Sequence, residues 1–250
     1  MMILAANPIY CLDPFEDVLN TIQEHFDGWE FLCEKEHGWD NREEIRDLLS
    51  TTDTEIQIHA PFNDINIASM NPRMRSAAVD EITKCFEMAN MLDVEKVTVH
   101  PGVKSPIGRY CKETKEFAIE SLIDIKIAAD EFGLTAPLEN MPDLWATTCI
   151  TPEDVSEHLD RTGMPFCLDV GHANTAGRLD DFLSFKPVNI HLNDNVGEKD
   201  LHLPLGEGEI DFEYVMKRLS GYNGNIVIEG RSMDGLIKSK KYLEDILNKI

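Results

Sequence analysis

The chain has 250 residues, of which 42% are hydrophobic and 28% are charged, so it is long enough to bury a sizeable core. Its 46 acidic residues outnumber its 23 basic residues, which gives a formal net charge of −23 at pH 7. This charge repels polyphosphates at long range, and it excludes a basic surface that wraps nucleic acid or anionic membranes.

Nothing in the sequence indicates a membrane protein or a secreted one. The longest uncharged apolar stretches, such as Met1–Tyr10, are shorter than the roughly 20 residues that a membrane-spanning helix needs. The first residues also lack the cationic start and cleavage site of a signal peptide. The six cysteines form no CxxC pair. We therefore expect a cytoplasmic protein without a membrane partner, and we expect a monomer.

Short β-rich runs alternate with longer amphipathic runs from one end of the chain to the other. The predicted strands are Met2–Ala6, Trp29–Cys33, Glu55–Ala60, Lys96–His100, Thr135–Glu139, Pro165–Asp169, Pro187–His191 and Asn225–Glu229. The predicted helices are Pro14–Phe26, Arg42–Ser50, Pro72–Leu92, Lys112–Phe132, Pro152–Arg161, Asp180–Phe185, Asp211–Leu219 and Gly235–Lys249. Asp13, Asn71 and Thr151 each precede a proline, as a capping residue does at a helix start.

The spacing of these elements favours an α/β fold of the (β/α)₈ TIM barrel type. Eight strand–helix units in 250 residues give about 31 residues per unit, as expected for βαβ repeats that close into a barrel. A doubly wound open sheet is the alternative, but Asn7 and Pro8 follow the first strand where that fold has a Gly-rich loop. No change of composition marks a boundary, so we predict a single domain over residues 1–250.

Residue types that bind metals end six successive predicted strands. The active site of a parallel barrel is built from the C-terminal strand ends and the loops after them. Charged residues and histidines are uncommon at buried strand ends unless they are paired or coordinated. With three more residues just beyond these ends, the candidate metal ligands are His59, His100, Glu139, Asp169, His172, His191, Asp200, His202 and Glu229.

Five imidazoles and four carboxylates suit Zn²⁺ better than Ca²⁺ or Mg²⁺. Nine ligands imply two or three ions, which can activate water and clamp the oxygens of a hydrolysed bond. Three divalent ions would also make the pocket cationic, so we expect a phosphorylated substrate. Two alternatives stay open: separate hydrogen-bonded histidines in a polar barrel mouth, and ion pairs of Glu139 and Glu229 with Lys96 or Arg231.

Seven segments carry a family resemblance as a set. They are Ile58-His59-Ala60-Pro61-Phe62, Val99-His100-Pro101-Gly102, Leu138-Glu139-Asn140-Met141, Leu168-Asp169-Val170-Gly171-His172, Ile190-His191-Leu192-Asn193-Asp194, Asp200-Leu201-His202 and Leu205-Gly206-Glu207-Gly208. Together they resemble the xylose isomerase-like TIM barrel superfamily, and within it the endonuclease IV family of zinc enzymes, which cut DNA at abasic sites.

The resemblance implies an assignment of ions to ligands. The first zinc would be bound by His59 and His100, the second by Asp169, His191 and Glu229, and the third by His172, Asp200 and His202. Glu139 would bridge the first two ions and position the attacking hydroxide, which makes it the expected catalytic residue. The implied activity is hydrolysis of a phosphoester, with DNA containing an abasic site as the implied partner.

The resemblance also implies contacts with the substrate. Phe62 stands where these endonucleases place an aromatic wedge against the bases, and Arg73 follows shortly after it. Arg231, just past Glu229, would hold a phosphate or hydroxyl group, with a surface ion pair as the alternative. The segment Glu30–His37 departs from the family, because it is acidic where the endonucleases carry a loop with Gln and Arg.

This departure keeps a second enzyme class open, a metal-dependent isomerase or epimerase of sugars or sugar phosphates. By the same resemblance, one Mn²⁺ or Mg²⁺ would then be held by Glu139, Asp169, His191 and Glu229. A third alternative is a barrel that only binds a ligand.

Other polar residues are expected outside this ligand set. Asn140, Asn193 and Asp194 would either orient the ligands or form turns. We expect His25, His37 and His158 on the surface.

Overall fold

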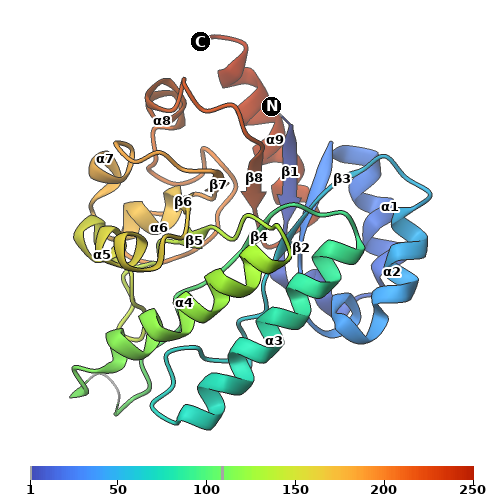
Figure 1. Ribbon diagram of the computed structural model, residues 1–250. Helices are drawn as coiled ribbons and strands as arrows, with labels where there is room; N and C mark the ends of the chain where they lie inside the picture. Colours follow the sequence, from blue (N-terminus) through green and yellow to red (C-terminus); the bar gives the residue numbers. More distant parts are fainter. Residues whose placement is uncertain (1, 108–109) are drawn as a thin grey trace.

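The computed structural model describes residues 2–107 and 110–250, and its strands form one parallel sheet of eight. The strands are β1 (Ile3–Ala6), β2 (Gly28–Leu32), β3 (Glu55–His59), β4 (Val97–Thr98), β5 (Leu138–Glu139), β6 (Phe166–Asp169), β7 (Asn189–Leu192) and β8 (Ile226–Glu229). Their order is β4-β3-β2-β1-β8-β7-β6-β5, so the first and last strands are neighbours (Figure 1).

Isolated parallel bridges close the sheet into a barrel. They pair Lys96 with Thr135 and Val99 with Leu138, and they join β4 to β5 at the two ends of the strand order. These two strands are shorter than predicted because regular pairing is limited to a few residues where the barrel closes. The prediction of a (β/α)₈ TIM barrel is confirmed.

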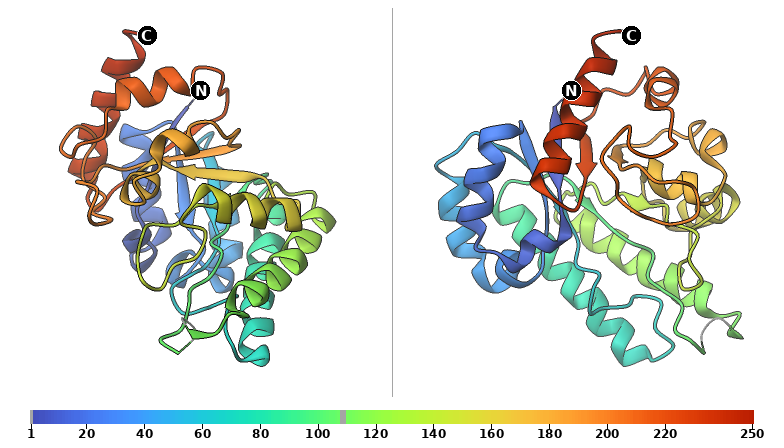
Figure 2. Two further views of the ribbon diagram at one scale, coloured as in Figure 1. Left: turned by 90° about the vertical axis from the view of Figure 1, so that its left-hand side faces the viewer. Right: turned by 180° about the vertical axis from the view of Figure 1, so that it is seen from behind.

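Helices surround the barrel (Figures 1 and 2). They are α1 (Phe15–His25), α2 (Arg42–Leu49), α3 (Pro72–Met91), α4 (Thr114–Glu131), α5 (Pro152–Thr162), α6 (Val170–Thr175), α7 (Leu179–Phe182), α8 (Phe212–Arg218) and α9 (Met233–Leu247). Each predicted helix has a counterpart, whereas α6 was not predicted. None of the helices in the described part of the chain is long and apolar enough to cross a membrane.

Two of the three predicted helix caps form. Asn71 Oδ1 accepts a hydrogen bond from the backbone N–H of Arg73 at 3.0 Å, and Thr151 Oγ1 accepts one from that of Asp154 at 3.2 Å. The prediction for Asp13 is wrong, because Pro14 itself occupies the cap position of α1 and no side chain caps that helix. The long helix α3 therefore starts at a fixed point beside the loop that follows β3.

Alternating side chains of β2 face opposite sides of the barrel wall. Trp29 and Phe31 point outward and pack on Phe15 of α1, with ring centroids 4.8 and 5.2 Å from its ring. Glu30 points into the barrel and is 2% exposed. The first three residues of the acidic segment Glu30–His37 lie in this strand, within the strand predicted over Trp29–Cys33.

The prediction of surface positions for His37 and His158 is wrong, because both side chains are fully buried. His37 follows β2 and packs edge-on against Phe15 and Trp29. The Nδ1 atom of His158 donates to the backbone carbonyl of Asp154 within α5 at 2.7 Å. A single neutral imidazole can be buried at a moderate cost in free energy. A histidine outside the candidate ligand set can therefore still lie in the core.

Candidate active site

The nine candidate ligands converge at the C-terminal end of the barrel. His59, Glu139, Asp169 and Glu229 are the last residues of their strands, and His191 lies within β7. The other four follow strands: His100 after β4, His172 on α6, and Asp200 and His202 in the loop between β7 and α8. The structure thus brings the whole predicted set together, while its binding of metal stays a prediction.

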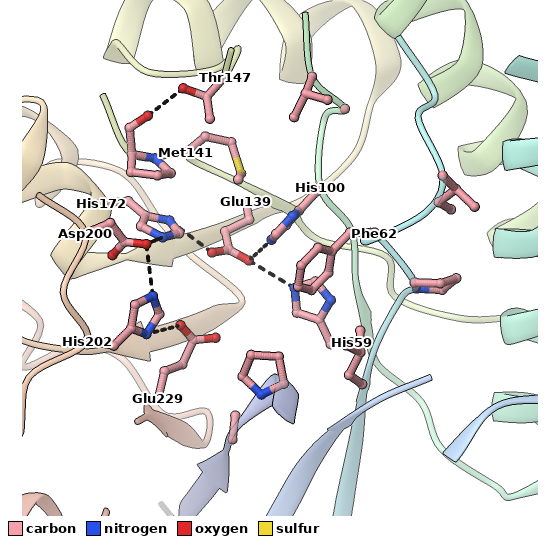
Figure 3. Close-up of a pocket in the computed structure, with 18 of the residues that line it drawn as sticks. His59, Phe62, His100, Glu139, Met141, Thr147, His172, Asp200, His202 and Glu229 are labelled. Atoms are coloured by element: carbon pink, nitrogen blue, oxygen red, sulfur yellow. Dashed lines mark hydrogen bonds and ion pairs between the residues drawn. The ribbon is translucent and has the colours of Figure 1, made fainter. Parts of the chain in front are cut away.

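Glu139 occupies the centre of this cluster (Figure 3). Its Oε2 atom lies 3.4 Å from His59 Nε2, 3.3 Å from His100 Nε2 and 3.5 Å from His191 Nδ1. Its other oxygen, Oε1, lies 3.2 Å from His172 Nδ1. One carboxylate therefore faces imidazoles from four different parts of the barrel.

Glu229 and Asp200 connect the remaining ligands (Figure 3). Glu229 Oε1 lies 3.0 Å from His191 Nδ1, and Glu229 Oε2 lies 3.4 Å from His202 Nδ1. Asp200 Oδ2 lies 3.1 Å from His202 Nε2 and 3.6 Å from His172 Nε2. The contacts form one continuous cluster of alternating acids and imidazoles.

The cluster fits divalent cations better than hydrogen bonds alone. Glu139 Oε2 and His191 Nδ1 lie at ion-pair distances from their neighbours, but neither they nor Asp200 Oδ1 make a hydrogen bond of good geometry among the described residues. His59 Nδ1 donates to the backbone carbonyl of Ala60 at 2.8 Å, so in the neutral ring Nε2 carries the lone pair and faces Glu139. Buried polar atoms without partners are costly, and coordination to an ion satisfies them.

The pKa values reflect the crowding of acids in a buried place. Burial raises the pKa of Asp169 to about 7, because nearby Glu229 and Glu139 add to the penalty that His172 only partly offsets. Burial also opposes ionisation of Glu229, but His191 and His202 outweigh it and lower the pKa of that carboxyl to about 2. An adjacent divalent cation is the group that would keep Asp169 ionised at neutral pH.

Two asparagines fix Asp169. The amide of Asn140 bridges the backbone of Asp169, accepting from its N–H at 2.9 Å and donating to its carbonyl at 2.9 Å. Asn193 Nδ2 donates to both carboxylate oxygens of Asp169, at 3.2 and 3.0 Å. A Cβ atom at Gly171 would lie 1.9 Å from Asn193 Oδ1, so glycine is required for this approach. The orienting role considered for both asparagines is what the contacts support.

Asp194 holds the loop that carries Asp200 and His202. Its side chain is fully buried, and its Oδ2 atom accepts from the backbone N–H groups of Gly206 and Gly208, both at 2.9 Å. Within this loop His202 has φ = 48°, a left-handed conformation that is unfavourable for a residue with a side chain. The loop is therefore tied down where it presents its two candidate ligands.

Glu30 is a site residue that sequence analysis missed. Its Oε1 atom lies 2.9 Å from His191 Nε2, and its Oε2 atom accepts from Gln57 Nε2 at 2.9 Å and Asn189 Nδ2 at 3.0 Å. The carboxylate thus lies beneath His191, on the side away from Glu139 and Glu229. The available signal was an acidic residue inside a predicted buried strand.

The cluster forms the floor of a cavity of about 340 Å³. Its outer wall is largely apolar, and it comes from the loops after β3, β4 and β5. Among the residues that the structure describes, neither lysine nor arginine lines this cavity. The main apolar side chains of the wall are Phe62, Ile65, Ile67, Val103, Met141 and Leu144.

The three predicted substrate-binding residues have different positions. Phe62 lines the cavity, with its ring centroid 4.6 Å from that of His100 (Figure 3). Arg73 lies exposed on the first turn of α3 and does not line the cavity, because the capped start of α3 lies outside it. Arg231 is also exposed, and it donates to the backbone carbonyls of Leu201 and Asp200 at 3.0 and 3.3 Å. Its donors therefore support the ligand-bearing loop.

The chain is similar to proteins of known sequence and to solved structures. The chain is 36% identical over 244 residues to the uncharacterized protein MJ1311 of Methanocaldococcus jannaschii, covering 92% of this chain and 83% of the relative. A crystal structure of a D-tagatose 3-epimerase-like protein is 34% identical, with a TM-score of 0.92, and the match covers 100% of this chain and 98% of the other. A probable endonuclease 4 of Acholeplasma laidlawii is 24% identical, covering 65% of this chain and 61% of the relative.

A structure of the IOLI protein with a bound zinc atom has the same fold, with a TM-score of 0.78 at 18% identity and coverage of 100% and 99%. The model of the family described as "Xylose isomerase-like TIM barrel" matches residues 19–248, which is nearly the whole chain. The chain therefore belongs to the xylose isomerase-like TIM barrel family.

Proposed function

We propose that the protein is a metal-dependent isomerase or epimerase that moves a proton at a carbon next to the carbonyl group of a small, uncharged hydroxycarbonyl compound. The observation that carries this proposal is the cavity, which combines a buried acid–imidazole floor with apolar walls. Its volume of about 340 Å³ lies at the lower end of the range for small-molecule sites. Neither lysine nor arginine among the described residues lines it to receive a phosphate group.

The residues of the floor supply the parts that such a reaction needs. Glu139, Asp169, His191 and Glu229 would hold one divalent ion, which when bound would polarise the substrate carbonyl as a Lewis acid. Glu139 and Glu229 reach the cavity from different strands, β5 and β8. Imidazoles around both carboxylates outweigh burial and lower their pKa values, so each is ionised at neutral pH.

The D-tagatose 3-epimerase-like relative supports this reaction class, and the lining argues against abasic-site DNA. Phosphate contacts supply most of the affinity of DNA-binding proteins, and they need lysine or arginine. Arg73 and Arg231 lie outside the cavity, and the acidic surface repels a polyanion. A neutral substrate meets neither obstacle.

The test is the exchange of carbon-bound hydrogen with solvent. Protein loaded with Mn²⁺ or Zn²⁺ is incubated in D₂O with a panel of ketoses, and deuterium at the carbons next to the carbonyl is followed by NMR. We expect exchange with at least one ketose, and we expect its loss in Glu139→Gln and Glu229→Gln. Hydrolysis of phosphoesters by the same preparation, with no exchange in any ketose, would refute the proposal.

A multinuclear zinc phosphoesterase is the second candidate, because one observation favours it. Five further residues of ligand type join the cluster, which is more than a single ion needs. They are His59, His100, His172, Asp200 and His202. The two candidates differ in the effect of His172→Ala and His202→Ala. Both variants should retain most of an isomerase activity, whereas they should abolish a trinuclear hydrolysis.

Metal content separates the same candidates. Elemental analysis of protein purified without a metal-binding tag should give one divalent ion per chain for the isomerase and about three zinc ions for the hydrolase. Asp200→Asn is a useful comparison, because it alters only the third group of ligands and leaves Glu139, Asp169, His191 and Glu229 in place.

A further inference from the structure

The cavity has two unlike halves. The floor carries the acids and imidazoles, and it faces any oxygen-rich part of a substrate. The outer wall is built by apolar side chains from three loops, including Phe62 and Ile67 after β3, Val103 after β4 and Leu144 after β5. A molecule that fills the cavity must place one end on each half.

The hydroxyl of Thr147 on the outer wall and the amide oxygen of Asn7, on the loop after β1, are already engaged. Thr147 Oγ1 donates to the backbone carbonyl of Pro142 at 2.6 Å and also contacts the backbone of Leu144 (Figure 3). Asn7 Oδ1 accepts from the backbone N–H of Ile9 at 3.0 Å, at the start of the short helix Pro8–Leu12. A substrate hydroxyl placed against the buried side chains of this wall, Ile67 and Met141, would lose its water and gain no comparable partner.

From this division we infer that the substrate ends in an apolar group, a methyl or short alkyl group, opposite its metal-bound hydroxycarbonyl end. The inference rests on the proposed function and narrows its substrate class to terminally deoxygenated hydroxycarbonyl compounds. A hydroxyl buried without a partner weakens binding by about 5- to 150-fold, whereas a methyl group gains from leaving water.

Matched sugars test the inference. The Mn²⁺-loaded protein is assayed with pairs of ketohexoses and their 6-deoxy counterparts across several stereoisomers, and kcat/KM is compared within each pair. We expect the 6-deoxy sugar to be preferred by about tenfold or more in the productive stereochemical series. Equal values, or a preference for the 6-hydroxylated sugar, would overturn the inference while leaving the proposed function intact.

Variants of one wall residue provide the internal control. Leu144 is 46% exposed, so its replacement should not threaten the fold. Leu144→Gln adds hydrogen-bonding groups and should reduce the preference for the 6-deoxy sugar several-fold, whereas Leu144→Met keeps the wall apolar and should retain it. A preference that is the same in both variants would contradict the assignment of the outer wall.

Binding measurements keep the inference testable if no ketose is turned over. In that case the proposed function fails, and calorimetric titration of the Mn²⁺-loaded protein with the same pairs decides the inference alone. Tighter binding of the 6-deoxy member, lost in Leu144→Gln, would support an apolar subsite. Binding that does not discriminate within any pair, or no binding of either member, would refute it.

Discussion

His37 makes folding stability depend on pH in a way that the structure allows to be calculated. Its ring is fully buried among Phe15, Trp29 and Phe31, and its Nε2 atom donates to the backbone carbonyl of Asp13 at 3.1 Å. The other nitrogen, Nδ1, has no hydrogen-bond partner among the described residues. Burial outweighs the hydrogen bond to Asp13 and lowers the pKa of His37 from 6.5 to about 4.

A histidine pKa that is lowered by folding leaves stability unaffected while the ring is neutral in both states and reduces stability at lower pH. Well above pH 6.5, His37 is neutral in both the folded and the unfolded chain, and the free energy of unfolding has its full value. As the pH falls from 6.5 to 4, the unfolded chain takes up a proton that the folded chain does not, so stability is lost. Each pKa unit corresponds to about 1.4 kcal/mol, and the loss between pH 7.5 and pH 5 is about 2 kcal/mol.

The variant His37→Phe keeps the aromatic packing and removes the titrating group. The free energy of unfolding is measured by urea denaturation at pH 7.5 and at pH 5 for each protein. Any constant cost of the larger ring cancels in the difference between the two pH values. The difference should be about 2 kcal/mol smaller in His37→Phe than in the wild type.

The control is His25→Gln, which removes an exposed histidine from α1. This side chain is exposed and lies outside the buried cluster around His37, so the variant should keep the wild-type difference. If His37→Phe and the wild type lose the same stability at pH 5, the argument from burial is refuted.

Three further predictions concern the site. Glu30→Gln should weaken divalent-metal binding by about 10- to 100-fold in a chelator competition assay, because His191 loses its buried carboxylate partner. An unchanged affinity would show that Glu30 does not support the metal site. Adding zinc at about 100 times its dissociation constant should stabilise the protein by about 2.7 kcal/mol, measured as a rise in Tm that EDTA reverses; no rise would contradict metal binding to the folded state. Asp194→Ala frees the N–H groups of Gly206 and Gly208, so proteolysis within residues 195–210 should accelerate while Asp211→Ala leaves it unchanged.

The fold and the convergence of the candidate ligands could be predicted because both depend on local sequence patterns. Alternation of β-rich and amphipathic runs identifies the repeat, and parallel strands in a barrel must end on the same side. A histidine or acid at a strand end, such as His59 or Glu139, is then placed near the others without any knowledge of side-chain geometry. The predicted boundaries of the strands agree with the observed ones to within about two residues at most ends.

The missed features depend on contacts between distant segments. Glu30 is a site residue only because β2 turns it inward beneath His191, which lies 161 positions later in the chain. The short helix α6 starts because Asp169, a candidate ligand, also caps it through the backbone N–H of His172 at 2.6 Å. The residues that line the cavity were also hard to predict from the sequence. Arg73 is close to Phe62 in the sequence, but only Phe62 lines the cavity.

Electrostatics at long and short range favour the same kind of substrate. The net charge of −23 repels anions before they reach the barrel, and the described lining of the cavity offers them no lysine or arginine. A single divalent ion would bring positive charge into the site, and the three surrounding carboxylates of Glu139, Asp169 and Glu229 would more than neutralise it. A neutral carbonyl needs only the local polarisation by such an ion, whereas a phosphate dianion needs a net positive site. The acidity that argues against phosphoesters is thus compatible with proton transfer on an uncharged molecule.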